Sequence, residues 1–127
     1  MRLNFFIPLC MVLVLVLSVL SGCSSPPEGS VTCCACLENQ IYDQEISVYG
    51  TVSKLGELFC LCFILTSEGE ELVVFYDTMV EDDGTERPAV DVSGIKNGDK
   101  VVVTGELKTE GVHRSENDFW ASSIEKR

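Results

Sequence analysis

A long hydrophobic run opens the chain, and the rest alternates between short apolar segments and polar turns. The run extends from Phe5 to Leu20, follows a short polar start and is broken only by Pro8 and Ser18. This is the layout of a secretory signal segment. Residues 24–30 lack apolar side chains apart from two prolines and also contain glycine, a composition typical of a flexible tether. The pattern therefore predicts a leader, a tether and one folded region.

Beyond the tether, the hydrophobic pattern predicts five β-strands and no well-defined helix. From Glu45 onwards apolar and polar side chains alternate, as in a strand with one buried face. The next apolar run is hydrophobic on both faces, so something must cover each face. A polar, glycine-containing turn then joins the second and third runs into an expected hairpin. The expected strands cover residues 45–53, 59–65, 72–76, 100–107 and 119–125.

The segments between these strands carry weaker patterns. Residues 37–44 are compatible with one or two helical turns or with irregular structure, and the pattern does not separate the two. Residues 77–99 are acidic, contain several glycines and a proline, and show no sustained helical period. We expect them to form a long irregular connection.

Five short strands with a long connection between the third and fourth match the organisation of an OB-fold, a small Greek-key barrel. Four stretches then resemble the small OB-domains of the tRNA-anticodon-binding-like group, namely residues 48–52, 63–65, 98–107 and 120–125. The resemblance implies an all-β, five-stranded Greek-key barrel, which we place at residues 45–127. Gly50 and Gly105 fall where such barrels bend their strands sharply. The helix usual in that group between strands three and four is not expected here.

The tetrapeptide Leu20-Ser21-Gly22-Cys23, which closes the hydrophobic run, resembles the lipobox of prokaryotic lipoproteins. The resemblance implies cleavage before Cys23 and a diacylglyceryl group on its sulfur, and two acyl chains give stable membrane attachment. It also implies a signal peptide at residues 1–22, followed by a tether at 23–32. The alternative is an uncleaved transmembrane helix, because about 20 apolar residues can span a bilayer. Either way, we expect the domain to be held at the cell membrane on its extracytoplasmic side.

The charge balance narrows the choice of partners. The 127 residues include 9 Lys and Arg against 20 Asp and Glu, a formal net charge of −11. An acidic surface repels nucleic-acid phosphates and anionic lipid headgroups, whose binding depends on Lys and Arg. Nucleic acid is therefore an unlikely partner. The acidity is equally compatible with a role in solubility alone.

The cysteines are the sharpest chemical feature. Of the 7 cysteines, Cys10 lies in the leader and Cys23 in the lipobox, which leaves Cys33, Cys34, Cys36, Cys60 and Cys62. Adjacent cysteines are too close for a relaxed disulfide, and two cysteines on one strand face lie near its upper limit. Bridges between the two clusters are thus expected. One such bridge closes a loop of about 25 residues and would add roughly 3.5 kcal/mol in the entropic model.

Two other states of these cysteines remain open. Four or five thiolates could hold a soft ion such as Zn²⁺ or Cu(I), although the spacings depart from the usual Cys-x-x-Cys zinc knuckle. The thiols could also stay free of metal. A metal-binding or disulfide-exchanging surface protein is therefore the alternative function. The leading expectation requires no cofactor.

No catalytic constellation emerges from the sequence, and the sole histidine, His113, lies in a polar loop. The chain is therefore expected to be a non-catalytic OB-fold binding or interaction module with an unknown ligand. Binding of single-stranded nucleic acid or oligosaccharide is a further alternative. Tyr49 and Tyr76 are the candidate ligand-facing aromatics for that role. Strand tyrosines packing on their neighbours would give the same pattern.

Overall fold

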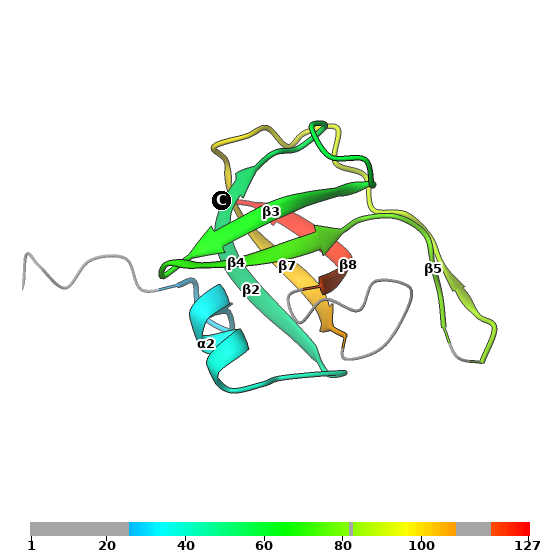
Figure 1. The fold of residues 1–127 in the computed structure, drawn as a ribbon, viewed down its shortest axis with the longest axis horizontal. Helices are drawn as coiled ribbons and strands as arrows, with labels where there is room; N and C mark the ends of the chain where they lie inside the picture. Colours follow the sequence, from blue (N-terminus) through cyan, green and yellow to red (C-terminus); the bar gives the residue numbers. More distant parts are fainter. Residues whose placement is uncertain (1–25, 82, 109–117) are drawn as a thin grey trace, which may run out of the picture.

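The computed structural model describes residues 26–81, 83–108 and 118–127. Its main strands are β2 (Glu45–Ser53), β3 (Cys62–Ser67), β4 (Glu70–Phe75), β7 (Lys100–Leu107) and β8 (Asp118–Lys126). They pair in the order β2-β3-β4-β8-β7, and β7 pairs again with β2, so the five strands close into a ring (Figure 1). The β4–β8 pair is parallel and the others are antiparallel. The predicted five-stranded, all-β OB-fold is confirmed.

The observed strand bounds differ from the predicted ones mainly at β3. The bounds of β2 and β7 are those predicted, and those of β4 and β8 differ by at most two residues. Strand β3 begins at Cys62, where its pairing with β4 begins opposite Phe75, and its pairing with β2 reaches only Ile64. The apolar residues 59–61 therefore belong to the loop before β3, where no strand covers them.

The core lies inside the ring. Alternation along each strand sends one set of side chains inward, and these side chains are buried. Two cysteines from a short helix complete the cluster. Its members are Cys33, Cys36, Val48, Val52, Phe63, Leu65, Leu72, Val74, Val101, Val103, Leu107, Phe119 and Ala121.

The segment before the ring is more ordered than the sequence predicted. Val31–Thr32, at the end of the predicted tether, form strand β1, which pairs in parallel with β2. Helix α2 (Cys33–Glu38) follows, and the Thr32 hydroxyl caps it by accepting a hydrogen bond from the Ala35 N–H at 3.1 Å. The helix buries Cys33 and Cys36, which lie three residues apart on one face.

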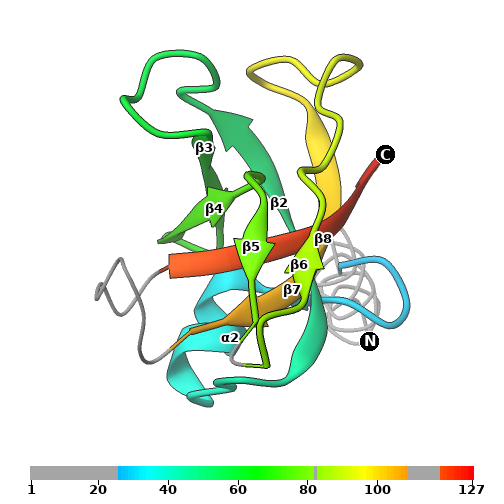
Figure 2. The ribbon, with the colours of Figure 1, turned by 90° about the vertical axis from the view of Figure 1, so that its right-hand side faces the viewer.

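The connection between β4 and β7 contains a small hairpin where an irregular segment was predicted. Strands β5 (Met79–Val80) and β6 (Glu86–Arg87) pair antiparallel. The hairpin projects from one side of the ring (Figure 1) and faces the viewer in Figure 2.

The two glycines expected at sharp bends lie where backbones approach closely. A Cβ on Gly105 would collide with the backbone carbonyl of Trp120, at the point where the β7–β8 register shifts. A Cβ on Gly50 would lie 2.8 Å from the Leu65 side chain and from the Thr66 carbonyl oxygen. Both strands therefore need glycine at these crossings.

The leader and the lipobox, including Cys23, lie outside the described residues. In the part of the chain that the structure describes, no helix has the length and apolar character needed to cross a bilayer.

Candidate binding surface

The outward side of β3, β4 and β8 carries a group of apolar side chains beside the polar Thr66, Glu71 and Asp118, although such a face is commonly polar when it meets water. Because Phe63, Val74 and Phe119 point into the core, their strand neighbours must point outward. The strand registers then place these neighbours side by side. We call the outward group of Ile64, Val73, Phe75 and Trp120 the outer apolar face.

Two stacked aromatic rings form the centre of this face. Phe75 and Trp120 are register partners on the parallel strands β4 and β8, and their ring centroids lie 4.8 Å apart at an interplanar angle of 16°. Phe75 is buried, whereas Trp120 and Val73 are half-buried. Ile64 is buried as well, so only Val73 and Trp120 offer partly exposed surface on this face.

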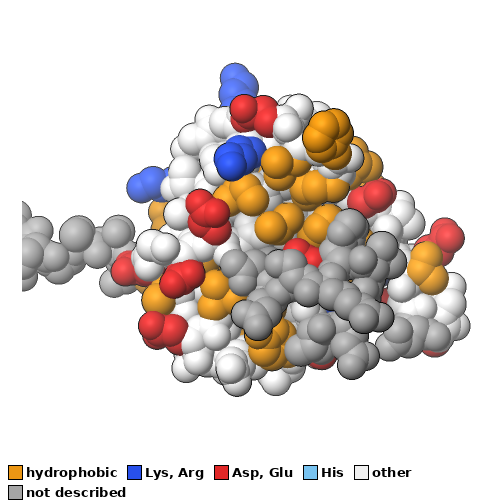
Figure 3. Space-filling view, viewed as in Figure 1, with side chains coloured by type: hydrophobic (Ala, Val, Ile, Leu, Met, Phe, Trp, Pro, Cys, Tyr) orange, Lys and Arg blue, Asp and Glu red, His pale blue; other side chains and the backbone are white. Residues whose placement is uncertain are grey.

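The loop of residues 54–61, between β2 and β3, adds two exposed large hydrophobic side chains. Phe59 has a relative exposure of 115% and Leu61 one of 50%. The loop is anchored at its end, because the Tyr76 N–H donates a hydrogen bond to the Leu61 carbonyl at 3.0 Å. Figure 3 shows hydrophobic side chains gathered over β3 and the loop that leads into it, bordered by both acidic and basic side chains. Burying such side chains against a partner is favourable.

A disulfide between Cys60 and Cys62 ties the end of this loop to the first residue of β3. The expected bridges between the two cysteine clusters were therefore wrong. The Cys33 Sγ donates a hydrogen bond to the Leu65 carbonyl at 3.4 Å, three residues beyond Cys62 along β3, a separation of roughly 10 Å. By strand alternation Cys62 faces outward, whereas Cys33 belongs to the core, so the two sulfurs lie on different sides of β3. The loop instead bends and brings the Cα atoms of Cys60 and Cys62 to 5.2 Å.

Cys33, Cys34 and Cys36 are free thiols. Burial raises the pKa of Cys33, and burial together with the neighbouring Cys33 raises the pKa of Cys36 to about 11. A hydrogen bond with Glu38 raises the pKa of the partly exposed Cys34. All three thus favour the neutral thiol over the thiolate that binds metals. Among the described residues, no group of three or more Cys, His, Asp or Glu side chains could hold a metal ion.

Tyr49 and Tyr76, the predicted ligand-facing aromatics, do not share a face. Tyr76 packs against the core, and its ring stacks on Phe63 with a centroid distance of 6.1 Å. Tyr49 lies on the outward side of β2, opposite the inward Val48. On the outward side, the fold brings Phe75 and Trp120 together instead. Sequence reasoning missed this pair because a parallel pairing between distant strands leaves no local pattern.

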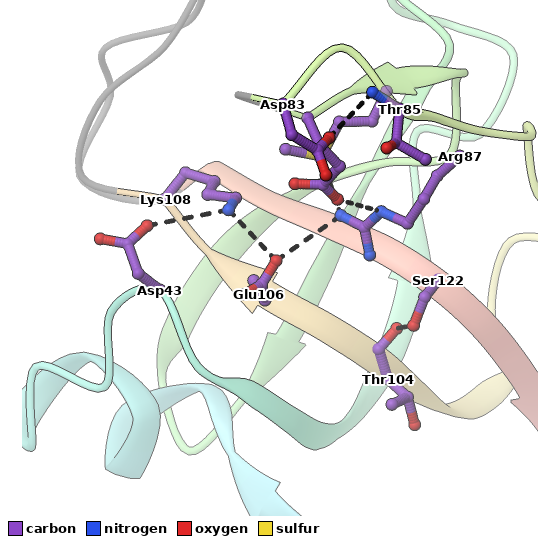
Figure 4. Close-up of polar contacts among 10 residues, drawn as sticks. Asp43, Asp83, Thr85, Arg87, Thr104, Glu106, Lys108 and Ser122 are labelled. Carbon is purple, nitrogen blue, oxygen red and sulfur yellow. Dashed lines mark hydrogen bonds and ion pairs between the residues drawn. The ribbon is translucent and has the colours of Figure 1, made fainter.

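An ion-pair network on another side of the ring holds the β5–β6 hairpin in place (Figure 4). Arg87 lies 2.8 Å from Glu81 and 3.6 Å from Glu106 of β7. Its Nε is not aligned for a hydrogen bond, so the contact with Glu81 is an ion pair. Lys108 extends the network from Glu106, at 3.1 Å, to Asp43, at 3.9 Å. The two cations thus bridge three carboxylates from different parts of the chain, so the network is a structural link between elements.

No protein-family model matches the chain, and no curated protein matches it either. Among solved structures, the chain is similar to OBody AM3L09 bound to hen egg-white lysozyme, with a TM-score of 0.54 and 18% sequence identity. The match covers 80% of this chain and 96% of that chain. At this level of identity the likeness concerns the fold, and it supports the five-stranded architecture described above.

Proposed function

We propose that this chain is a membrane-tethered, extracytoplasmic OB-fold interaction module that binds an apolar, positively charged polypeptide segment. The binding surface would be the outer apolar face together with Phe59 and Leu61. The observation that carries the proposal is the exposure of these two side chains at the end of an anchored loop. Exposed hydrophobic groups of this kind commonly mark sites of protein association.

The chemistry of the surface favours a polypeptide over a nucleic acid or a sugar. Bases and sugars bind to open aromatic planes, and single-strand binders add a basic groove. Here Phe75 and Trp120 stack on each other, so one plane of each ring is already occupied. The remaining members are aliphatic, apart from Phe59, and none is Lys or Arg. Apolar side chains of a polypeptide fit such a surface better.

The charge of the chain favours a basic partner. The formal net charge is −11. The exposed Asp77 follows the anchor residue Tyr76, and within the loop the exposed Glu57 is accompanied by one exposed cation, Lys54. Complementary charge speeds association and disfavours partners of like charge. A second copy of this chain would be repelled for the same reason. The OBody, a protein of similar fold, was solved bound to hen egg-white lysozyme, which supports a protein partner.

The proposed location depends on the lipobox resemblance at Leu20-Ser21-Gly22-Cys23. A lipid group on Cys23 would leave only residues 24–30 between the membrane and strand β1, which begins at Val31. Partners would therefore be met close to the membrane surface.

The binding test uses Trp120, the sole tryptophan of the chain, as its reporter. The full-length protein, purified in detergent, is titrated with a synthetic peptide of alternating leucine and lysine while tryptophan emission is recorded. We expect a saturable change in emission, because the peptide would settle over the half-buried indole. Matched peptides replace leucine with serine or lysine with glutamate.

Both matched peptides should bind at least about tenfold more weakly, since one loses the apolar contacts and the other the charge attraction. If the serine–lysine peptide bound equally well, association would be purely electrostatic and the outer apolar face would not be the site. If no peptide changed the emission, the proposed function would be wrong.

A further inference from the structure

We infer that the Cys60–Cys62 disulfide is a thiol–disulfide exchange site that oxidises paired thiols in polypeptides bound at the outer apolar face. The choice of substrate rests on the proposed function. The exchange chemistry itself depends on the placement of the two sulfurs.

The two ends of the disulfide differ in accessibility. Cys60 lies in the loop and is partly exposed, whereas Cys62 is fully buried as the first residue of β3. The rate of exchange depends on which sulfur an incoming thiolate can reach. The geometry therefore directs attack to Cys60 and makes Cys62 the leaving sulfur.

The disulfide contributes little as a structural staple. It links residues only two apart in sequence, so it scarcely restricts the unfolded chain. The start of β3 is already held by its pairing with β4, in which Cys62 lies opposite Phe75, and by the hydrogen bond between Tyr76 and Leu61. A bridge that is accessible and structurally dispensable is suited to exchange.

The side chains flanking Cys60 are suited to an unfolded substrate. Phe59 and Leu61, on either side of it, are the exposed hydrophobic residues of the loop. Unfolded polypeptides expose both apolar side chains and unpaired thiols. Contact with Phe59 and Leu61 would therefore hold a substrate thiol beside the Cys60 sulfur, which raises its effective concentration.

The free thiols of α2 do not compete for this role. Cys33 and Cys36 are buried, and both have raised pKa values that suppress the reactive thiolate. Cys34 is partly exposed, but its hydrogen bond with Glu38 also raises its pKa.

The exchange proceeds in two balanced steps. A substrate thiolate attacks the Cys60 Sγ, the Cys60–Cys62 bond breaks, and Cys62 leaves with the electron pair and takes up a proton from water. The second substrate thiolate then attacks the substrate sulfur of the mixed disulfide, which expels Cys60 as a thiolate that is also protonated. The substrate dithiol has lost two electrons and two protons to the former disulfide. Each molecule performs this transfer once, so no further oxidant is required.

The test uses the full-length protein carrying Cys34→Ser, which removes the partly exposed free thiol. A reduced synthetic peptide with two cysteines four residues apart and leucine–lysine flanks is added in equimolar amount. Samples are quenched with acid, alkylated and analysed by mass spectrometry. A second peptide has serine–lysine flanks, and a third has leucine–lysine flanks with serine in place of both cysteines.

We expect stoichiometric oxidation of the first peptide, about tenfold faster than that of the serine-flanked peptide. A peptide with one cysteine should be trapped on Cys60. The Phe59→Ser/Leu61→Ser variant should lose the rate advantage, whereas Val80→Ser, which alters an exposed hydrophobic residue of the β5–β6 hairpin, should keep it.

Two results would overturn the inference, and they distinguish a failure of exchange from a failure of binding at the outer apolar face. If neither cysteine peptide were oxidised while the third peptide still changed Trp120 emission, exchange would fail and the proposed binding function would stand. If both were oxidised at the same rate, the sulfur chemistry would not use the outer apolar face.

Discussion

At the residue scale, Gly105 lies where a side chain cannot be accommodated. An alanine Cβ there would collide with the backbone carbonyl of Trp120, and paired strands leave that carbonyl little freedom to move. We expect Gly105→Ala to lower the free energy of unfolding by about 1–3 kcal/mol in urea titrations. Gly94→Ala is the matched control, because nothing lies within 4 Å of its added Cβ. Equal stabilities of the two variants would contradict the close approach.

The buried thiol of Cys36 makes stability depend on pH in the alkaline range. Burial raises its pKa from 9.0 to about 11, so the unfolded chain releases this proton at a lower pH than the folded one. The corresponding stabilisation is present below pH 9 and is lost as the pH rises through about 11. The full loss amounts to about 2–3 kcal/mol.

The measurement is the free energy of unfolding from pH 7 to pH 11 for the wild type and for Cys36→Ala. Lysines and tyrosines titrate in both proteins, so the difference between the two curves isolates the thiol. We expect the advantage of the wild type to shrink above pH 9. A constant difference would show that Cys36 has the same pKa in the folded and unfolded chains.

At the scale of elements, the β5–β6 hairpin should depend on Arg87. Arg87→Gln removes the ion pairs with Glu81 and Glu106, which are partly screened by water, so we expect global stability to fall by no more than about 1 kcal/mol. Local opening of the hairpin should respond to Arg87→Gln more strongly than global stability does. The Glu81 amide, bonded to the Thr85 carbonyl at 2.8 Å, should exchange its hydrogen about fivefold faster.

Arg127→Gln is the control for this change, because it breaks an ion pair with Glu125 near the end of the chain. It should leave exchange at Glu81 unaltered. If Arg87→Gln also left hydrogen exchange at Glu81 unaltered, the ion-pair network would not hold the hairpin in place.

Elements with a regular pattern could be predicted from sequence, and elements that depend on tertiary contacts could not. Strands β2 and β7 show clear hydrophobic patterns and were found as predicted. Helix α2 has only six residues and gains its stability from burying Cys33 and Cys36, with Thr32 as its cap. Two features of the sequence could have indicated this helix, namely Thr32 as a capping residue and the three-residue spacing of Cys33 and Cys36.

Less of the candidate binding surface could be predicted from the sequence. The continuous apolar run placed residues 59–61 in a strand, so their exposure in a loop could not be foreseen. The disulfide between Cys60 and Cys62 was missed for the same reason, since an extended strand separates two such cysteines more widely than the bent loop does.

At the scale of the whole molecule, the lipid anchor should decide where the protein resides. Cys23→Ser removes the sulfur that would carry the lipid. We expect the variant, expressed in a bacterial host, to lose labelling by a radioactive fatty acid and to leave the membrane fraction. Retention of an unprocessed chain in the membrane would instead favour the transmembrane alternative for residues 5–20.

The central claim is that the fold presents Phe59 and Leu61 beside the outer apolar face to bind an apolar, basic polypeptide. The most direct test compares the affinity of the leucine–lysine peptide for the full-length wild type, for Phe59→Ser/Leu61→Ser and for Val80→Ser, with Trp120 emission as the signal. We predict that the double variant binds at least about tenfold more weakly and that Val80→Ser binds like the wild type. Equal affinities of all three proteins would contradict the claim, because the peptide would then bind without the two residues that define the surface.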